Sequence, residues 1–454
     1  MLKYETDSRK VVPGQIFVAI KGYTVDGHDF ISQAISNGAT KVIASKKTDC
    51  SVPLLIVDNP EDYLKKALTK EYSGELKNLK IIGVTGTNGK TTTCYLIYQL
   101  LKKLKVKVAY MGTIGFFYED EIINLPNTTP DILTIYKLLL NAKEKGCKTI
   151  VMEVSSHALS LGRIDGLNFS LGAFTNLTED HLDYHKTMTD YLNAKLKILN
   201  YMTKDGVFVV NNDDLASKKF KENFKNIMTI GFYYSDYQIK NCKFLPNKTE
   251  LSFKYQNKDF LVTTNLTGKF NIYNYMTSLA IVHEYGFKIE DILDKTRNIY
   301  APKGRCETFL VNDYFAVVDY AHTPDAVLKV IMAFKELAKA KIITVIGCGG
   351  DRDPLKRPIM GEIATDKSDY VIFTNDNPRT EDPEKIMRDI IAGVHKNNYE
   401  IVYDRHEAIF KALTIAKKND IVLILGKGHE NYQIFGHEKV HFDDQEEIKK
   451  FIKK

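Results

Sequence analysis

The sequence predicts an α/β protein with three domains, of which the central one has a P-loop-type, mostly parallel sheet. Apolar runs of strand length alternate with amphipathic helical segments along most of the 454 residues, which is typical of doubly wound sheets. The strand-like run 81–84 leads through a glycine-containing loop into the amphipathic segment 95–104, as in phosphate-binding loops. A turn at residues 301–305 precedes a second series of strands and helices. We therefore expect domains at residues 1–79, 80–301 and 302–454.

The first domain is expected to be a small α/β unit. Its pattern predicts short strands at residues 15–20, 41–44 and 54–57, and a helix at residues 29–37. The polar segment 72–80 is expected to be a linker into the strand before the phosphate loop.

The two larger domains are expected to alternate strands and helices. In the central domain the predicted strands are 106–110, 149–154, 171–175 and 206–211, and the predicted helices are 132–145, 189–199 and 273–285. Residues 244–264 have shorter, more polar β segments and predict an antiparallel insertion. In the last domain the predicted strands are 315–319, 342–347, 370–374 and 421–425, with a helix at 324–340.

The composition is that of a globular protein without special targeting. Hydrophobic residues make up 44% of the chain, and the net charge of +6 comes from lysines scattered among acidic residues. Without a basic tract, nucleic acid is not an expected partner. No apolar run approaches about 18 residues and the N-terminus is polar, so neither a membrane span nor a signal peptide is expected. The six cysteines form no C-x-x-C pair, which favours a reducing, cytoplasmic location.

The loop TGTNGKTTT at residues 85–93 has the chemistry of a phosphate site. Its glycines let backbone N–H groups face inward, Lys90 can reach the outer phosphates, and the Thr91 hydroxyl can reach Mg²⁺. The loop is shorter than the usual pattern, because Val84 stands where the first glycine would be. The alternative is a chance glycine turn, which the coincidence of strand, loop, lysine and hydroxyl disfavours.

Polar side chains also follow other strands of this predicted sheet. Glu153 lies near the carboxyl end of an apolar strand, where Mg²⁺ is a natural partner and a core salt bridge is the alternative. The loop 175–185 crowds acids and histidines, among them His181, beyond the next strand, where they form either a site or an ordinary surface. Asn271 and Asn274 open a helix and can either cap it or contact a base edge.

Four predicted strands of the last domain end in polar loops that contain glycine or proline. Because carboxyl ends of parallel strands share one edge of a sheet, these loops should converge. Arginine side chains in them can bind carboxylates through two hydrogen bonds. The edge therefore predicts a site for a charged small molecule, such as an amino acid with several charges. The loops are residues 319–325, 348–353, 375–379 and 426–430.

Eight motifs in this order resemble the Mur ligase family, and the resemblance covers essentially the whole chain, including DSRKVVPGQIFVAIKG at 7–22. It implies a UDP-binding domain, an ATPase domain and a Rossmann-like C-terminal domain. It further implies the activity of the members that use ATP and Mg²⁺ to add a diamino acid to UDP-N-acetylmuramoyl-L-alanyl-D-glutamate, in peptidoglycan precursor synthesis. The motifs are TGTNGKTTT (85–93), MEVSSHAL (152–159), FTNLTEDHLDYH (174–185), GKFNIYNY (268–275), DYAHTPD (319–325), GCGGDRDPLKRP (347–358), DNPRTEDP (376–383) and GKGHENYQ (426–433).

The resemblance also implies roles for single residues. Lys195, which the helical pattern leaves as a solvated charge, matches a lysine that CO₂ converts to a carbamate (N6-carboxylysine), an anionic oxygen ligand for Mg²⁺. The implied catalytic residues are Lys90, His181, Lys195 and His322, and the implied metal ligands are Thr91, Glu153, His181 and Lys195. The implied ATP contacts are Gly86, Thr87, Asn88, Gly89, Lys90, Thr91, Thr92, Asn271, Asn274, Arg305 and Asp319. The implied contacts to the UDP-linked dipeptide are Ser8, Asn127, Thr128, Thr129, Ser155 and Arg163, and those to the amino acid are Arg352, Asp376, Asn377, Pro378, Arg379, Gly426 and Glu430.

The implied reaction passes through an acyl phosphate. The D-glutamyl γ-carboxylate attacks the γ-phosphate of ATP, and the amine of the incoming amino acid then displaces phosphate. The sequence DNPR (376–379) is similar to that of members that take meso-diaminopimelate. The resemblance implies that Arg379 would pair with the carboxylate at the far end of that amino acid. The analogue meso-lanthionine carries the same terminal groups. Leu161 stands where some members have a glutamine, which leaves one substrate contact open.

Three alternatives remain at this stage. The same reaction could use meso-lanthionine or L-lysine, or the chain could be another ligase of the superfamily, such as folylpolyglutamate synthase. A protein that keeps the fold only as a nucleotide sensor belongs to a different class, and the retained lysines, Glu153 and His181 disfavour it. A monomer is expected.

Overall fold

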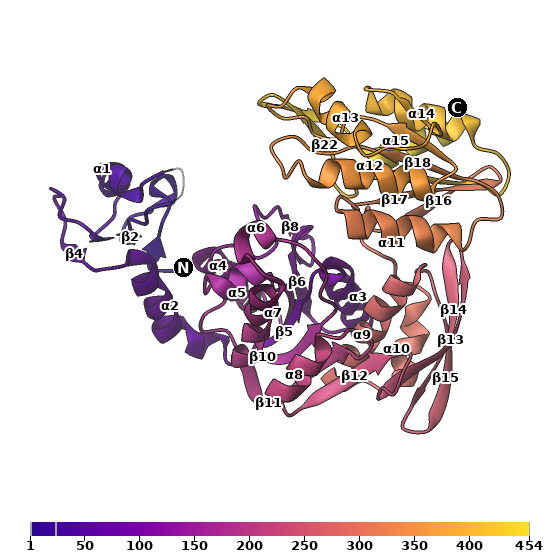
Figure 1. Cartoon of the computed structure of the whole chain (residues 1–454). Helices are drawn as coiled ribbons and strands as arrows, with labels where there is room; N and C mark the ends of the chain where they lie inside the picture. Colours follow the sequence, from indigo (N-terminus) through magenta and orange to yellow (C-terminus); the bar gives the residue numbers. More distant parts are fainter. Residues whose placement is uncertain (1, 23–24, 454) are drawn as a thin grey trace.

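The computed structural model describes residues 2–22 and 25–453 and has the predicted three-domain α/β architecture (Figure 1). The N-terminal sheet is parallel, in the order β1-β2-β3-β4, and its strands are β1 (Tyr4–Glu5), β2 (Ile16–Val18), β3 (Lys41–Ala44) and β4 (Leu54–Ile56). Its helical segments are η1 (Ser8–Lys10), η2 (Gly27–Phe30), α1 (Ile31–Ser36) and α2 (Pro60–Leu76).

The linker expected at residues 72–80 is wrong in its first half. Helix α2 starts at Pro60, is capped by the Asn59 side chain, and continues through Leu76. The signal was present in the sequence, because apolar residues recur every fourth position and so line one face of a helix. These buried residues are Leu64, Leu68, Tyr72 and Leu76.

The central sheet has eleven strands in the order β15-β14-β13-β12-β11-β10-β5-β9-β6-β7-β8. Its middle is parallel, and the antiparallel insertion expected near residues 244–264 is confirmed as β13–β15. The antiparallel strands β7 and β8 at the other edge were not predicted. The strands are β5 (Lys80–Thr85), β6 (Val108–Gly112), β7 (Gly115–Tyr118), β8 (Glu121–Ile123), β9 (Thr149–Glu153), β10 (Phe169–Phe174), β11 (Met202–Asn211), β12 (Ile227–Gly231), β13 (Tyr237–Leu245), β14 (Lys248–Tyr255) and β15 (Lys258–Thr264).

Helices cover both faces of this sheet and bury two separate apolar clusters against it. Helices α3 and α9 pack against each other on one face, with Leu100 and Leu279 among the residues of that cluster, and α4 lies on the other face with α2. The helical segments are α3 (Lys90–Lys103), α4 (Ile132–Glu144), α5 (Ser156–Ser160), α6 (Leu182–His185), α7 (Met188–Leu196), η3 (Lys197–Tyr201), α8 (Ser217–Asn223), α9 (Lys269–Tyr285) and α10 (Ile289–Thr296).

The C-terminal sheet has the order β16-β17-β21-β18-β19-β20, in which only β16 is antiparallel. The four strands whose loops were expected to converge are adjacent and parallel, which confirms that prediction. A separate hairpin, β22–β23, lies outside the sheet. The elements are β16 (Glu307–Val311), β17 (Tyr314–Asp319), α11 (Pro324–Lys335), β18 (Ile342–Ile346), α12 (Lys356–Lys367), β19 (Tyr370–Phe373), α13 (Pro383–Ile391), β20 (Tyr399–Ile401), α14 (Arg405–Ile415), β21 (Ile421–Leu425), β22 (Tyr432–Phe435), β23 (Glu438–His441) and α15 (Asp444–Ile452).

The domains touch through specific polar contacts. The N-terminal and C-terminal sheets lie on different sides of the central one in Figure 1. Lys137 on α4 pairs with the buried Glu5 of β1 at 2.5 Å. Asn88 of the phosphate loop donates a hydrogen bond of 3.2 Å to Asp325 at the start of α11, which joins the central and C-terminal domains.

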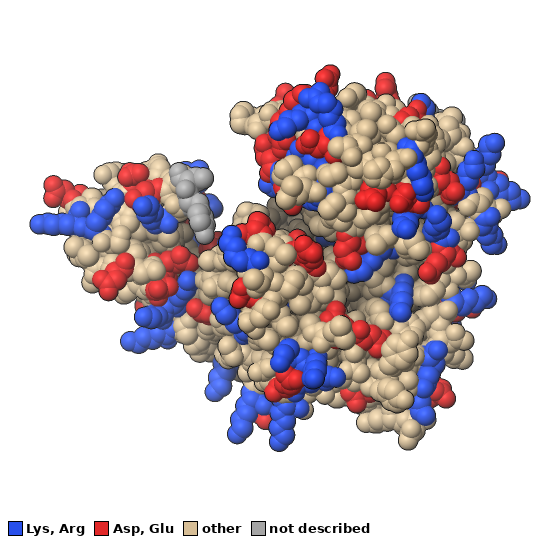
Figure 2. All heavy atoms as spheres, in the orientation of Figure 1, with Lys and Arg blue, Asp and Glu red and all other residues tan. Residues whose placement is uncertain are grey.

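Two surface properties bear on partners. Lysine and arginine side chains alternate with acidic ones over the face shown in Figure 2, without a continuous basic stripe. Within residues 2–22 and 25–453, every helix is too short or too polar to cross a bilayer.

Candidate active site

The phosphate loop joins β5 to α3 and depends on two glycines. Gly86 and Gly89 have φ of +147° and +84°, a region that side chains with a Cβ rarely adopt. A Cβ at Gly86 would lie 1.9 Å from the Thr175 hydroxyl, and one at Gly89 would lie 2.3 Å from the Asn274 side chain. Residues Gly86 to Thr92, all expected to contact ATP, thus form a close-packed loop and the first turn of α3. The N–H groups of Thr87 and Asn88 donate to Asn176, so the N–H groups suited to bind an anion are those of the first turn of α3.

Glu153 ends strand β9 and is fully buried. Its Oε1 accepts hydrogen bonds from the Tyr110 hydroxyl at 2.5 Å and the Thr113 N–H at 2.8 Å, while Oε2 accepts from the Thr91 hydroxyl at 2.9 Å and the Thr113 hydroxyl at 3.2 Å. A Cβ at Gly112 would lie 2.1 Å from Oε1, so glycine is needed beside the carboxylate. In the described chain the hydrogen bonds to the Glu153 carboxylate come from neutral hydroxyl and N–H groups and no basic side chain pairs with it, so the core salt bridge considered above is wrong.

Two lysines meet at one carbonyl of the phosphate loop. Lys195 of α7 is 1% exposed and donates to the Gly86 carbonyl at 2.8 Å, and Lys90 donates to the same oxygen at 2.9 Å and to the Thr87 carbonyl at 2.8 Å. The Lys195 ammonium also lies 4.2 Å from the centre of the Tyr191 ring. Burial, and then the charge of Lys90, holds the pKa of Lys195 well below its usual value. The solvated lysine that the helical pattern suggests is therefore wrong.

His181 lies at the start of α6. Its backbone is left-handed, with φ of +55°, and its Nε2 lies 3.5 Å from Asp180. Burial lowers the pKa of His181, and the ammonium groups of Lys90 and Lys195 also lower it, against the opposing effect of Asp180, so the surroundings favour the neutral ring. In the described part of the chain, no three His, Cys, Asp or Glu side chains form a metal site by themselves.

The two asparagines of α9 are buried beneath the phosphate loop. The Asn271 amide donates to the Thr267 carbonyl at 2.9 Å, and the Asn274 amide donates to the Asn271 side chain at 3.2 Å. The Thr93 hydroxyl donates to Asn274 at 3.3 Å. Among the described residues, no side chain forms a capping hydrogen bond at the start of α9, so the capping alternative is wrong for both asparagines.

The first loops of the C-terminal domain bring Arg305, Asp319 and His322 to one place. The Arg305 guanidinium lies 4.6 Å from the centre of the Tyr320 ring, and its buried Nε has no hydrogen-bond partner among the described residues. Asp319 accepts hydrogen bonds of 2.8 Å from the N–H groups of Cys306 and Ala321, and burial raises its pKa. The His322 ring packs on the same Tyr320 at 4.6 Å between centres.

Four of the residues expected to bind the UDP-linked dipeptide cluster beside Glu153. The Thr129 hydroxyl donates to the Glu153 carbonyl at 2.8 Å and accepts from the Ser155 N–H at 3.1 Å. Arg163 donates to the Thr129 carbonyl at 2.9 Å, and the Thr128 hydroxyl lies 3.0 Å from that of Thr113. Ser8 lies in the N-terminal domain and donates to Gln33 at 2.6 Å, and Asn127 is exposed on the loop after β8, directly before Thr128 in the chain.

The residues expected to bind the amino acid converge on the loop after β19. Asn377 is buried and donates to Glu430 at 2.8 Å, while Arg379 donates to the Gly350 carbonyl at 2.6 Å. A Cβ at Gly426, where φ is +112°, would lie 2.7 Å from the Asp376 carboxylate. The remaining predicted contacts are the buried Pro378, in the same loop, and the exposed Arg352, in the neighbouring loop after β18.

Sequence reasoning missed several residues that hold these groups in place. Thr113 directly follows strand β6, so the rule that ligands gather at strand ends could have found it. Lys427 is fully buried and donates to Asn377 and Glu430 at 3.2 Å each. Arg357 is fully buried between Glu381 and Asp389, and only the folded structure shows this pairing.

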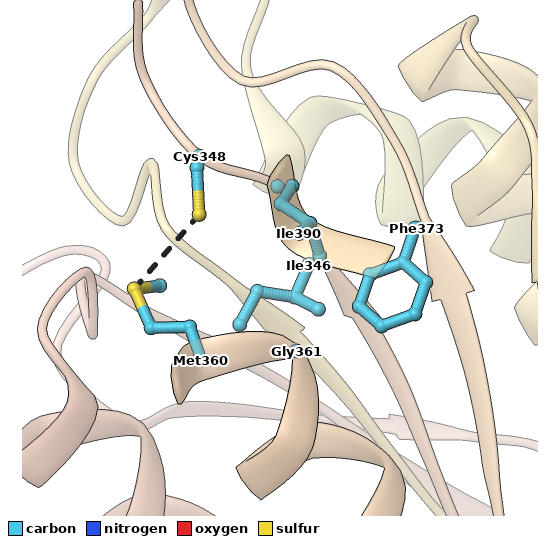
Figure 3. A pocket seen from close by; sticks show the side chains of 7 residues that line it. Ile346, Cys348, Met360, Gly361, Phe373 and Ile390 are labelled. Atoms are coloured by element: carbon cyan, nitrogen blue, oxygen red, sulfur yellow. Dashed lines mark hydrogen bonds between the residues drawn. The ribbon is translucent and has the colours of Figure 1, made fainter. Parts of the chain in front are cut away.

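Two hollows lie outside this cluster. One of about 260 Å³ lies at the carboxyl ends of β2, β3 and β4, with Lys21, Ser45 and Asp58 in its wall and the start of α2 beside it. The other lies beneath the loop after β18 and is apolar; there the Cys348 thiol points to Met360 at 3.9 Å (Figure 3). Burial raises the pKa of Cys348 to about 12, so this second hollow is packing space without a reactive group.

Family models match three successive parts of the chain: "Mur ligase family, catalytic domain" at residues 4–78, "Mur ligase middle domain" at 84–282 and "Mur ligase, glutamate ligase domain" at 304–428. A Bacillus cereus protein named UDP-N-acetylmuramoyl-L-alanyl-D-glutamate--2,6-diaminopimelate ligase is 40% identical over 457 residues, covering 99% of this chain and 93% of its own. The chain belongs to the Mur ligase family. A Clostridium acetobutylicum member named as number 1 of the same ligase is 42% identical, covering 98% of this chain and 94% of its own.

Solved structures of Mur ligases share the fold. One, titled as a structure of UDP-N-acetylmuramoyl-L-alanyl-D-glutamate--2,6-diaminopimelate ligase, has a TM-score of 0.71 and 34% identity, covering 99% of this chain and 94% of that one. MurF ligase from Thermotoga maritima in complex with ADP also has a TM-score of 0.71, at 22% identity, and covers 99% of this chain and 97% of its own. The second likeness concerns the fold alone.

Proposed function

We propose that this Mur ligase uses ATP to join meso-diaminopimelate to UDP-N-acetylmuramoyl-L-alanyl-D-glutamate during peptidoglycan precursor synthesis. The observation that carries this is the full-length identity of about 40% to ligases named for that reaction, together with a DNPR loop at the expected strand end. We propose domain boundaries near residues 79 and 301. We further propose that the protein acts as a cytoplasmic monomer; its six free cysteines fit a reducing compartment.

Phosphoryl transfer is assigned to the groups around the phosphate loop. ATP phosphates would lie against the N–H groups at the start of α3, and Lys90 would leave the Gly86 and Thr87 carbonyls to contact them. Thr91 and Glu153 supply hard oxygen donors 2.9 Å apart, which suits Mg²⁺. Bound there, Mg²⁺ would neutralise charge on the phosphate oxygens. The substrate γ-carboxylate attacks the γ-phosphorus, ADP leaves, and an acyl phosphate remains.

Lys195 is proposed to be carbamylated. Its amine attacks CO₂, a C–N bond forms, and one proton is released, so the reaction needs the neutral amine that burial favours here. The carbamate oxygens, with the neutral His181, would then complete the oxygen and nitrogen donors for metal near the phosphate loop. We propose that the nucleotide is held by Asn271 and Asn274 of α9 and by Arg305, Asp319 and His322 of the C-terminal domain.

The N-terminal hollow is proposed to hold the UDP end of the substrate. It lies at the carboxyl ends of parallel strands, where α/β proteins bind ligands, and its volume of about 260 Å³ fits part of a nucleotide. The start of α2 offers N–H groups to a diphosphate. The peptide end would then reach Thr128, Thr129, Ser155 and Arg163 beside Glu153.

Arg379 is proposed to select the amino acid through its far carboxylate. Phosphate release with ATP, Mg²⁺ and the UDP-linked dipeptide tests this, comparing meso-diaminopimelate, meso-lanthionine and L-lysine. We expect release with diaminopimelate and little with lysine, because an unpaired arginine penalises lysine. Comparable release with lysine would contradict the role of Arg379, and no release with any of the three would contradict the proposed reaction.

A further inference from the structure

In the described part of the chain, the hairpin β22–β23 forms no strand pairs with the six-stranded sheet, and it lies against the loop proposed to bind the amino acid. Two-stranded hairpins are marginally stable alone, so this one needs a packing partner. Its partner is the segment 375–379, which contains the DNPR sequence. The hairpin thus lies directly behind the proposed specificity loop.

Gln433 of β22 forms hydrogen bonds with the start of that loop. Its side chain is 5% exposed, and its Nε2 donates to the Asp376 carbonyl at 2.9 Å and to the Asn375 carbonyl at 3.4 Å. The next residue, Ile434, donates its N–H to the Asn377 side chain at 3.0 Å. The Asn377 amide that contacts Glu430 is therefore held from the hairpin side as well.

The hairpin also sets the backbone of Arg379. The Arg379 N–H donates to the Ile434 carbonyl at 3.0 Å, and the Gly436 N–H donates to the Arg379 carbonyl at 2.7 Å. Arg379 has φ of +54°, which is unfavourable for a residue with a long side chain unless its surroundings hold it there. These two hydrogen bonds hold it, and they fix the direction in which the guanidinium leaves the backbone.

We propose that β22–β23 determines amino-acid specificity and that Gln433 is a positioning residue, acting through Asp376 and Arg379 on the far ammonium and carboxylate of a diamino dicarboxylic acid. The inference rests on the proposed function. A bidentate arginine contact depends on its direction, so a small rotation of this backbone weakens carboxylate recognition more than it weakens overall binding. Gln433 itself stays behind the loop and does not touch the ligand.

Two substitutions separate the hydrogen bonds of Gln433 from its shape. Gln433→Met keeps the length of the side chain and removes both donors, while Gln433→Glu keeps the shape and places a carboxylate against two carbonyl oxygens. We expect the KM for meso-diaminopimelate to rise about tenfold in the Met variant and further in the Glu variant. The preference for diaminopimelate over lysine should fall, while the KM for ATP stays unchanged. Val440→Ala is the matched control, because Val440 pairs with Gln433 across the hairpin and is partly exposed.

Acyl-phosphate formation, followed as ADP–ATP exchange without amino acid, should be unchanged in all three variants. Wild-type KM values and selectivity in both Gln433 variants would overturn the inference, as would an equal rise in the KM for ATP, which would indicate general destabilisation. If the wild-type protein forms no product with any of the amino acids, the proposed function itself fails. If the wild type is active and the variants match it, only the role of the hairpin fails.

Discussion

Replacing Glu153 by glutamine should abolish activity while leaving the fold intact. The substitution keeps size and polarity and removes only the negative charge. In the structure the carboxylate is fully buried, its partners are hydroxyl and N–H groups, and Thr91 of the phosphate loop is one of them. A buried carboxylate whose partners are all neutral lowers the stability of the fold. Such a group is expected where it serves to bind a cation.

The magnitude follows from the four hydrogen bonds. A glutamine carbonyl in place of Oε1 keeps the bonds from Tyr110 and Thr113, and an amide nitrogen in place of Oε2 can donate to the two threonine hydroxyls. All four contacts can therefore persist, and we expect the free energy of unfolding to change by less than about 2 kcal/mol. Glu153→Ala leaves the two Oε1 donors unpaired, at about 1 to 3 kcal/mol each, so it should lose about 2 to 6 kcal/mol.

Two measurements test this prediction. Urea unfolding gives the free energy of unfolding of each variant, and phosphate release at several Mg²⁺ concentrations gives its turnover. Loss of a metal ligand should lower turnover at least about 100-fold, since even residues that only support such ligands cost tenfold or more. The reasoning is refuted if the glutamine variant turns over at the wild-type rate with unchanged Mg²⁺ dependence. Strong destabilisation of the glutamine variant would refute the hydrogen-bond assignment instead.

Three further predictions concern Lys195, Asp444 and Gly89. Lys195→Met should be inactive. With CO₂ excluded, so that the wild-type lysine stays unmodified, the variant should also be more stable at pH 7, because the unfolded chain holds this proton more tightly than the folded one; the gain should shrink as pH rises towards 10.5, as urea unfolding across pH would show. Asp444→Ala leaves the fully buried Arg405 without its partner, so urea unfolding should show a loss of about 3 to 5 kcal/mol, whereas a change below about 1 kcal/mol would contradict this. Gly89→Ala should weaken ADP binding in calorimetry, because its Cβ would meet Asn274 at 2.3 Å; unchanged affinity would show that the loop can adjust.

The sequence was most informative where patterns are local. The strands at 41–44 and 421–425 have the expected bounds, and the polar loops of the C-terminal domain meet at one sheet edge as parallel strands require. The hairpin β22–β23 was not predicted, because five of its eight strand residues are exposed and show no buried apolar face, and because its stability comes from the loop it contacts. Helix α2 was overlooked although its four-residue spacing was visible.

The candidate site likewise combines features that the sequence predicts with features that only the folded structure shows. The phosphate loop and Glu153 follow from strand-end rules that act along the chain. The burial of Lys195 could not be read from α7, because what covers this lysine is the carbonyl of Gly86, 109 residues earlier in the chain. The roles of Lys427 and Arg357 likewise depend on loops that meet only after folding.

The contact from Asn88 to Asp325 has a consequence for engineering. The amide that reaches the C-terminal domain belongs to the loop proposed to hold ATP, and it donates at 3.2 Å both to Asp325 and to the Thr178 hydroxyl. A chimaera that took its C-terminal domain from another ligase, in order to attach a different amino acid, would therefore inherit a junction inside the proposed catalytic centre. Exchange of these domains should succeed only where the donor domain offers an acceptor at the position of Asp325.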